Sequence, residues 1–282
     1  MKLRNKILMS AAALAACAAT LTSTTFAWYV SNNQATANNI QGSTAAAGTQ
    51  GNILVAKTEN GVAGAYTQNI SFAGDTTHIM IPEKGLIPVT KVVTGEGESK
   101  TETWKAVDDS TIAEADAYMT WDVWVLSTTK TDVTVELSVT NKTTNPTVQT
   151  CYNATGAPVA QGETFAIDAV EALRMEVLQD GESLGVFSVK QLATNYSSPD
   201  AYTQLKDDTD SNKYYKALMG KDPLGGVTET DPTATTDFTA LTVTANVGSK
   251  LTYRVWLEGT DSACFDSCAG QIFEFALKYK TE

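Results

Sequence analysis

Alternation between apolar and polar residues is the sequence feature that most constrains the fold of this chain. The alternation runs through 133–140, 173–177, 241–247, 251–258 and 273–279. In the first of these segments, one set of alternate positions is aliphatic throughout: Val133, Val135, Leu137 and Val139. A period of two places one face of a strand on a core and the other toward water. The pattern therefore predicts a β protein.

Further strands are predicted at 52–57, 66–72, 78–81, 87–93 and 118–127. Asp180-Gly181 predicts a hairpin turn, because both residues tolerate positive φ. Roughly ten short strands separated by turn residues are typical of an all-β, two-sheet antiparallel sandwich, jelly-roll-like in topology. Long amphipathic helices between the strands are missing from the sequence, which argues against parallel βαβ connections.

Two insertions interrupt the strands, near 94–117 and 194–236. The first is charged and rich in turn residues, with a helical turn predicted at Glu114-Ala115-Asp116. The second is long and contains a short predicted helix around 213–219. Long excursions in compact domains are often functional or mobile.

The N-terminus has the order of features that marks an export signal. The basic residues Lys2, Arg4 and Lys6 precede an apolar run over 7–21, and Ala27 stands before the first aromatic residues. This order predicts a signal peptide over 1–27, cleaved between Ala27 and Trp28. The apolar run is too short and too rich in Ala, Ser and Thr for a permanent span of about 20 apolar residues. We therefore expect an extracellular or cell-surface protein that meets the membrane only during export.

Lipidation is the alternative fate of the N-terminus. Leu14-Ala15-Ala16-Cys17 fits the lipoprotein processing box, in which Cys17 would become the first residue and carry lipid. Cleavage after Ala27 is favoured, because Ala- and Thr-rich sequence continues past Cys17. Both outcomes stay open at this point.

The processed chain divides into an arm and a domain. Residues 28–51 are low in charge and rich in Asn, Thr, Ala and Gly, which predicts an extended arm; 52–282 form one β domain. Cleavage would remove 27 of 282 residues and three of the 20 Lys and Arg, leaving 255 residues with a net charge of −15. So acidic a chain argues against nucleic acid or anionic lipid as a partner.

Catalytic constellations are missing from the sequence. The single histidine, His78, cannot form a two-histidine zinc motif, and neither Gly-x-Ser-x-Gly nor a phosphate-binding loop occurs. Carboxylates such as Asp108 and Asp109 lie in charged, loop-like sequence. We predict a protein that is not an enzyme; a hydrolase with an unrecognised site is the least favoured alternative.

No cofactor is predicted, and calcium is the one weak candidate ligand. Asp208, Asp210 and Asn212 place oxygen donors at alternate positions, but Lys213 and Met219 stand where an EF-hand needs Gly and Glu. A solvated turn is the simpler interpretation.

Three cysteines follow the signal: Cys151, Cys264 and Cys268. A disulfide between Cys151 and one of the late pair, a local Cys264–Cys268 bridge, and buried thiols are all open interpretations.

Two strands carry large apolar residues on both faces, with Trp124 and Trp256 on the faces opposite the aliphatic ones. One interpretation is a central strand covered on both sides. The other is an exposed apolar surface for a partner.

The signal exit Thr25-Phe26-Ala27-Trp28-Tyr29 resembles that of secreted Gram-positive proteins of the TasA/camelysin type. The late block 253–261, with Cys264, Gly270 and 273–279, resembles the ending of related exported β proteins. The resemblance implies a jelly-roll sandwich, a dedicated signal peptidase and, as in the fibre-forming members, a biofilm-matrix filament. It also implies that the new N-terminus, Trp28, Tyr29 and Val30, acts as a donor strand for the next subunit. No metal-ligand set is recognisable, so a peptidase activity is not carried over.

These features favour a fibre, matrix or pilus-like subunit on the surface of a Gram-positive-type bacterium, with a second copy of the chain as its partner. The alternative is a monomeric surface-binding module for carbohydrate or a host protein, using Trp124, Trp256 or the 194–236 loop.

Overall fold

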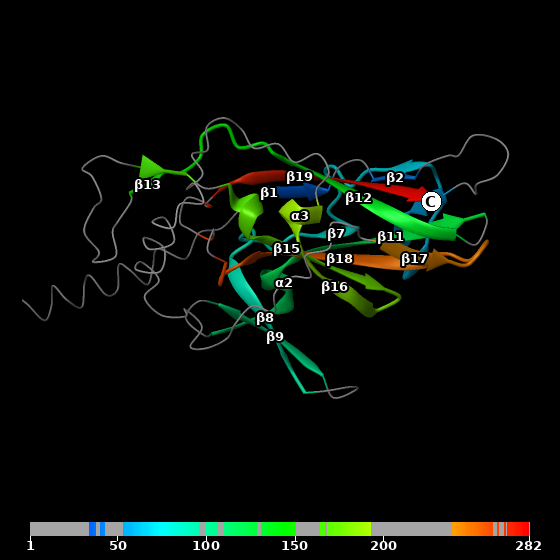
Figure 1. Cartoon of the computed structure of the whole chain (residues 1–282), viewed down its shortest axis with the longest axis horizontal. Coiled ribbons are helices and arrows are strands. Elements are labelled where there is room, and N and C mark those ends of the chain that lie inside the picture. The colour runs from blue at the N-terminus through cyan, green and yellow to red at the C-terminus, as the bar shows by residue number, and fades with distance from the viewer. Residues whose placement is uncertain are drawn as a thin grey trace, which may run out of the picture.

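The computed structural model describes residues 34–37, 40–42, 53–95, 100–106, 110–128, 131–150, 164–166, 168–192, 239–261, 264, 268 and 270–281. These residues form a mostly β structure with few and short helices (Figure 1). The prediction of a β protein is confirmed. The helical elements are α2 (Glu114–Ala117), the 3-10 turn η2 (Ala169–Ala172) and α3 (Val189–Leu192).

The larger sheet has nine strands and curls around the body of the molecule (Figure 1). Its centre is β18 (Ser249–Glu258), which pairs with β11 (Met119–Ser127) along one edge and with β15 (Leu173–Gln179) along the other. The remaining strands are β3 (Ile53–Ala56), β7 (Ile79–Met80), β8 (Pro88–Thr94), β9 (Thr101–Ala106), β10 (Thr111–Ile112) and β16 (Glu182–Ser188).

The second sheet has six strands and contains both the N-terminal and the C-terminal described segments. Its order is β17-β12-β19-β2-β6, and β1 also pairs with β19. The strands are β1 (Gln34–Ala37), β2 (Ile40–Gly42), β6 (Asn69–Ile70), β12 (Thr131–Asn141), β17 (Thr239–Val243) and β19 (Ile272–Thr281). Two antiparallel pairs of short strands form separate two-stranded sheets: β4 (Thr58–Glu59) with β5 (Val62–Ala63), and β13 (Gln149–Thr150) with β14 (Thr164–Phe165).

The alternating segments form strands, and most show the expected alternation of burial, but β15 is buried on both faces from Leu173 to Leu178. In β11 the burial pattern alternates without a break from Met119 to Ser127. Asp180 and Gly181 have φ of 51° and 95° at the turn between β15 and β16, as the hairpin prediction requires. The predicted strand over 241–247 ends at Val243, because a turn follows and leaves Val247 53% exposed.

Side chains of the two sheets meet in one hydrophobic core. Trp121 stacks on Tyr253 at a centroid separation of 5.2 Å and lies 6.2 Å from the ring of Phe275 on the other sheet. The Tyr253 and Tyr279 hydroxyls form a 2.8 Å hydrogen bond between the sheets. Burial raises the pKa of both phenols, which keeps them neutral and hydrogen-bonded.

The prediction of wholly antiparallel sheets is wrong. β1 and β2 both run parallel to β19, and β8 runs parallel to β18 at Leu257 and Glu258. Alternation fixes which face of a strand is buried, but it carries no information about the direction of the neighbouring strand.

The first insertion, predicted as a loop with a helical turn, contains more structure than expected. The helical turn is confirmed as α2, but 101–106 forms β9 and extends the large sheet. The short alternating stretch Thr101–Ala106 buries Trp104 and Ala106, which explains the strand. The second insertion, 194–236, lies outside the described residues.

Candidate functional site

Two strands of the predicted arm lie along the last strand of the chain. β1 pairs with β19 from Gln34 opposite Ile272 to Ala37 opposite Phe275. β2 continues farther along β19, where Gln41 lies opposite Lys278 and Gly42 opposite Tyr279. We call β1 and β2 the arm strands, and their main-chain pairing with β19 the seam (Figure 1).

β19 is well suited to receive another strand, because its own position does not depend on the arm. Its opposite edge pairs with β12 from Val133↔Thr281 to Asn141↔Phe273. Its inward side chains are buried in the core: Phe273, Phe275, Leu277 and Tyr279. The edge that faces the arm strands therefore belongs to a strand that the domain itself holds in place. Such an edge can bind an extended segment through main-chain hydrogen bonds.

Most of the predicted site residues lie outside the described residues: Cys17, Ala27, Trp28, Tyr29, Val30, Cys151, Asp208, Asp210 and Asn212. Signal cleavage, lipidation, the leading donor residues and the calcium candidate therefore stay predictions. Cys264 and Cys268 are described, and both are buried. A disulfide involving them stays a prediction as well. Within the described part of the chain, no three His, Cys, Asp or Glu side chains are grouped to hold a metal ion.

A second candidate region lies on the outer face of the large sheet. The described residues of 88–118, which include β8, β9, β10 and α2, project from the body (Figure 1), and we call them the lobe. Trp104 of the lobe packs against Tyr118 at 4.9 Å and edge-on against Trp256 of β18 at 5.1 Å. Val89 and Ala117 complete this second hydrophobic cluster.

The burial of Trp124 and Trp256 distinguishes between a covered strand and an exposed apolar surface. Trp256 is only 1% exposed, so β18 is covered on both faces at this point and the exposed-surface interpretation is wrong for this residue. Trp124 is half-buried, and its Nε1 donates to Thr58 Oγ1 at 3.0 Å. Neither ring is a free apolar platform.

Four charged side chains join the lobe to the sheet. Lys91 Nζ lies 2.6 Å from Glu102 Oε1 and 2.7 Å from Glu176 Oε1. Arg254 Nη1 lies 3.0 Å from Glu102 Oε2 and 3.3 Å from Glu176 Oε2. Ser183 Oγ also donates to Glu176 at 2.7 Å. The Lys91 and Glu176 side chains are 8% and 2% exposed, so solvent screens this network only weakly.

The charges of this network balance one another. Burial on its own would raise the pKa of Glu102, but the Lys91 ammonium and the Arg254 guanidinium outweigh it, and the pKa lies below its ordinary value. For Arg254, burial would lower the pKa, but Tyr118, Glu176 and Glu102 raise it. The arrangement holds the Glu102 carboxylate ionised, which suits a clamp rather than a proton-transferring site.

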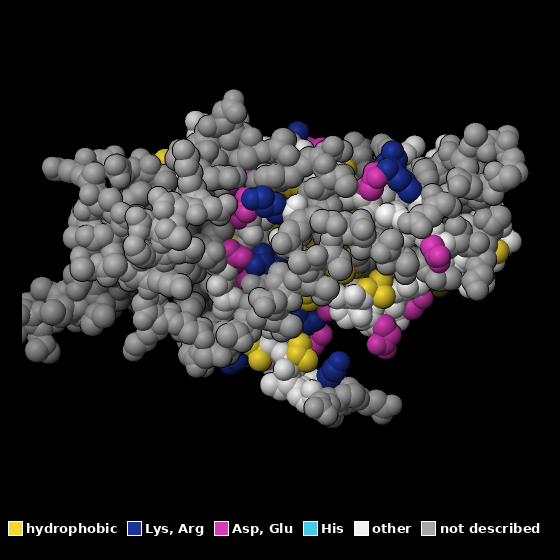
Figure 2. Space-filling view, in the orientation of Figure 1, with side chains coloured by type: hydrophobic (Ala, Val, Ile, Leu, Met, Phe, Trp, Pro, Cys, Tyr) yellow, Lys and Arg dark blue, Asp and Glu magenta, His cyan; other side chains and the backbone are white. Residues whose placement is uncertain are grey.

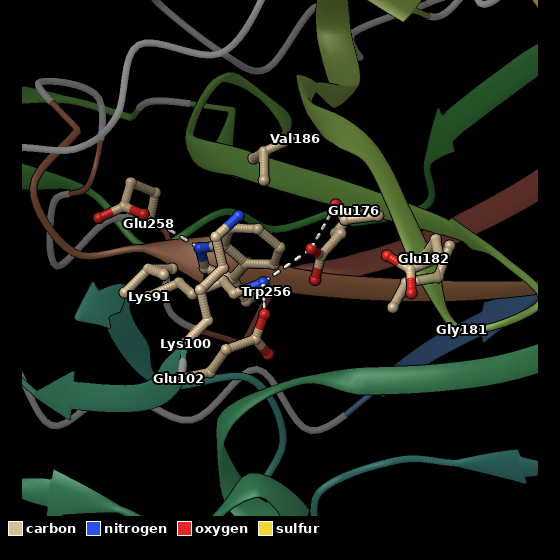
Figure 3. A pocket seen from close by; sticks show the side chains of 12 residues that line it. Lys91, Lys100, Glu102, Glu176, Gly181, Glu182, Val186, Trp256 and Glu258 are labelled. Atoms are coloured by element: carbon tan, nitrogen blue, oxygen red, sulfur yellow. Dashed lines mark hydrogen bonds and ion pairs between the residues drawn. The ribbon is translucent and has the colours of Figure 1, made fainter. Parts of the chain in front are cut away.

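A pocket of about 360 Å³ opens between the β8–β9 and β15–β16 hairpins (Figure 3). Lys91 and Glu102 reach from the lobe toward Glu176 across this pocket, and Trp256 forms part of its wall. The carboxylate of Glu258 at one end accepts hydrogen bonds from Thr90 Oγ1, Trp256 Nε1 (3.0 Å), Thr260 N (3.1 Å) and Thr260 Oγ1 (2.7 Å). The buried carboxylates of the pocket are thus already engaged in holding the lobe on the sheet.

Sequence patterns did not predict this network of charged side chains. Alternation assigned Glu176 and Arg254 to the water-facing side of their strands, but the lobe covers that side. The available signal was the aromatic residues on the same face, Trp256 and, in the inserted segment, Trp104.

His78 stabilises a loop and lies in neither the seam nor the lobe. Its Nδ1 lies 2.8 Å from Asp75 Oδ2, which also accepts from Lys57 Nζ at 2.6 Å. Burial would raise the pKa of Asp75, but Lys57 and the main-chain N–H groups of His78 and Thr77 lower it well below its ordinary value. Ile79 is buried and His78 only half-buried, as is usual for neighbouring residues whose side chains point to opposite sides.

Charged and hydrophobic side chains are both visible on the described part of the face shown in Figure 2. In the face shown in Figure 2, basic and acidic side chains lie side by side and the exposed hydrophobic areas are small and separate. The large hydrophobic residues that are exposed are scattered along the chain: Val62, Val93, Val148, Leu184 and Val247. Within the residues that the structure describes, no helix combines the length and apolarity required to cross a bilayer.

No protein-family model matches this chain, and neither a curated protein nor a solved structure shows significant similarity to it.

Proposed function

We propose that this protein is an exported structural subunit that assembles into an extracellular fibre or matrix by exchanging its N-terminal arm between copies. The observation that carries the proposal is the seam, in which β1 and β2 pair with β19 of the same chain. A second copy of the chain has an identical arm. It can therefore make the same main-chain hydrogen bonds in the same register.

Strand exchange of this kind produces a filament. Each subunit would donate one arm and accept another at a different place on its surface, which is a heterologous contact that propagates unless the rotation closes a ring. The arm strands are short and separate: four residues of β1 and two of β2 pair with β19. These properties favour a segment that can leave one subunit and enter another.

Export would create the donor. In the proposal, a dedicated signal peptidase cuts between Ala27 and Trp28, and Trp28, Tyr29 and Val30 lead the released arm. Lipidation at Cys17 would instead tether the arm to the membrane. The proposal is non-enzymatic, needs no cofactor or nucleic acid, and places the protein outside a Gram-positive-type cell. It also treats the two sheets as a jelly-roll-like sandwich, which their shared core of Trp121, Tyr253 and Phe275 supports.

Electron microscopy and light scattering of the processed protein test the proposal. We expect filaments from the chain that begins at Trp28 and folded monomers from one that begins at Ser43. A synthetic peptide covering 28–42 should bind the truncated chain, whereas a scrambled peptide should not. Persistent monomers of the correctly processed chain would refute the fibre proposal.

The pocket favours a second candidate, a monomeric surface module that binds a small polar ligand such as carbohydrate. Its volume of about 360 Å³ lies within the range of small-molecule sites. The burial of Trp256 removes the aromatic platform that this function would use, so we rank it below the fibre. Binding of oligosaccharides that is lost on substituting Glu182, a pocket residue exposed to solvent, would favour it instead.

A further inference from the structure

A cluster of buried polar side chains lies where β12 ends, β19 begins and η2 crosses between them. Its members are Asn141, Thr143, Asp168 and Gln271, which are 4%, 7%, 0% and 0% exposed. The cluster belongs to neither the seam nor the pocket. Four buried polar side chains in one corner of a hydrophobic core require a specific physical reason.

Hydrogen bonds fix the orientation of the two amides. Asn141 Oδ1 accepts from Thr143 N at 2.9 Å, so Asn141 Nδ2 is the end that donates to Asp168 Oδ1 at 2.8 Å and to Gln271 Oε1 at 2.9 Å. Gln271 Oε1 also accepts from Ala169 N at 2.8 Å. Carboxylate, amide and hydroxyl oxygens therefore lie close together in this corner, connected by hydrogen bonds.

Asp168 is the anomaly in this cluster. Its Oδ1 accepts from Asn141 Nδ2 and from Val170 N at 3.0 Å, but its buried Oδ2 has no hydrogen-bond partner. Among the described residues, no lysine, arginine or histidine forms an ion pair with it. A buried carboxylate without a compensating charge is strongly unfavourable. A water molecule would supply a hydrogen bond to Oδ2 but no charge.

We propose that Asp168 Oδ2 is a ligand of a bound monovalent cation, with sodium as the natural occupant outside a cell. Hard cations prefer oxygen ligands of the kinds gathered here. The cluster carries one formal negative charge, so a monovalent cation makes the corner neutral. A divalent cation would leave a net positive charge buried, which carries its own desolvation cost.

The site would stabilise the corner from which the receiving strand starts. Gln271 immediately precedes β19, and Ile272 is both the first residue of β19 and the partner of Gln34, the first residue of β1. Thr143 Oγ1 accepts from Ile272 N at 2.8 Å, which links the cluster directly to that residue. The inference does not depend on the fibre proposal, because a bound cation would stabilise this corner in monomer and filament alike.

Thermal unfolding of the processed protein in 150 mM sodium chloride and in 150 mM choline chloride tests the inference at equal ionic strength. Both solutions have about the ionic strength of physiological fluid. We expect the Tm to be about 2–4 °C higher in sodium. This is the shift for a domain of this size when the sodium concentration is several times the dissociation constant of the site. Equal Tm values in the two salts would overturn the inference.

Variants assign any difference to this corner. Asp168→Asn keeps the shape of the side chain and should abolish the difference between the salts, whereas Asp116→Asn, at an exposed carboxylate of α2, should retain it. A salt difference that survives in Asp168→Asn would place the cation elsewhere and refute the assignment.

Should Asp168→Asn fail to fold, Gln271→Glu provides a second test. It adds a carboxylate to the same corner and should change the preferred ion from sodium to calcium. We expect calcium at about 1 mM, a concentration that weak extracellular sites require, to raise the Tm of Gln271→Glu but not of the wild type. A variant indifferent to calcium would contradict the site.

Discussion

The arm strands and the lobe are both attached to the same body, but by different kinds of interaction. The arm strands contact β19 along the main chain, over four residues of β1 and two of β2. The lobe is joined to β18 and β15 by specific side chains: an aromatic cluster around Trp104 and a buried network of four charges.

This difference teaches which attachment can be exchanged. Main-chain pairing accepts any strand of compatible register, so an identical arm from another subunit fits equally well. The lobe needs Lys91 opposite Glu176 and Trp104 against Trp256, and its removal would leave buried charges without partners. We therefore expect substitutions in the lobe to affect folding and substitutions in the arm to affect assembly.

The largest effect is expected in the aromatic cluster. Trp104→Ala should lower the free energy of unfolding by about 3–5 kcal/mol, because Trp104 is 1% exposed and a cavity would remain. Urea denaturation followed by circular dichroism measures this loss. Val93→Ala, in the same hairpin but 49% exposed, should cost less than about 0.5 kcal/mol. Equal losses in the two variants would show that the lobe is not held by Trp104.

Breaking the charge network should have the next largest effect. Glu176→Gln should cost about 3 kcal/mol, since Lys91 and Arg254 would share Glu102 alone in a buried setting. Glu102→Gln should cost only about 1 kcal/mol, because Glu102 is 33% exposed and water compensates for its loss. The ratio of the two losses, again from urea denaturation, tests burial as the cause. A smaller loss for Glu176→Gln would reverse the argument.

Alkaline pH should weaken the lobe through Tyr118. Burial, together with a hydrogen bond to Glu114, raises the pKa of Tyr118 to about 12 against the opposing charge of Arg254. The unfolded chain loses this proton near pH 10, whereas the folded chain keeps it until about pH 12. Stability is therefore fully present below pH 10 and falls as pH rises toward 12, by about 2–3 kcal/mol from this group.

The urea midpoint measured at several pH values between neutrality and pH 12 checks this expectation. Tyr118→Phe should reduce the slope of stability against pH by the contribution of one proton. The loss of stability at alkaline pH that arises from Tyr253 and Tyr279, whose pKa values are also raised, should persist. Superimposable profiles for Tyr118→Phe and the wild type would contradict the assignment.

The smallest effect on folding, and the largest on assembly, is expected at the seam. Proline at both Ala35 and Thr36 removes two consecutive N–H donors, and alternate residues of a strand donate to the same neighbour. The free energy of unfolding of the monomer should fall by about 1 kcal/mol or less, because each lost hydrogen bond is offset by the ordering of the arm. Filaments should be absent by electron microscopy. Proline at both Ala45 and Ala46, outside the arm strands, is the matched control; filaments in both double variants would exclude the seam as the assembly contact.

The sequence was sufficient to locate the strands but not to identify the segments that pack beside them. Alternation located the strands that became β12, β15, β18 and β19, and Asp180-Gly181 located the hairpin between β15 and β16. It assigned Glu176 and Arg254 to water, because a local pattern cannot show that a distant insertion folds over that face. It also could not show that Gln34 lies beside Ile272, more than 200 residues farther along the chain.

The sequence by itself determined that this is a β protein and where its alternating strands lie, because these properties depend on residues close together in the chain. Only the tertiary structure decided that the arm runs parallel to β19, that the lobe covers Trp256, and that Asp168 is buried with one oxygen unsatisfied. Each of these depends on contacts between distant segments, whose direction and burial are set by the packing of the whole chain.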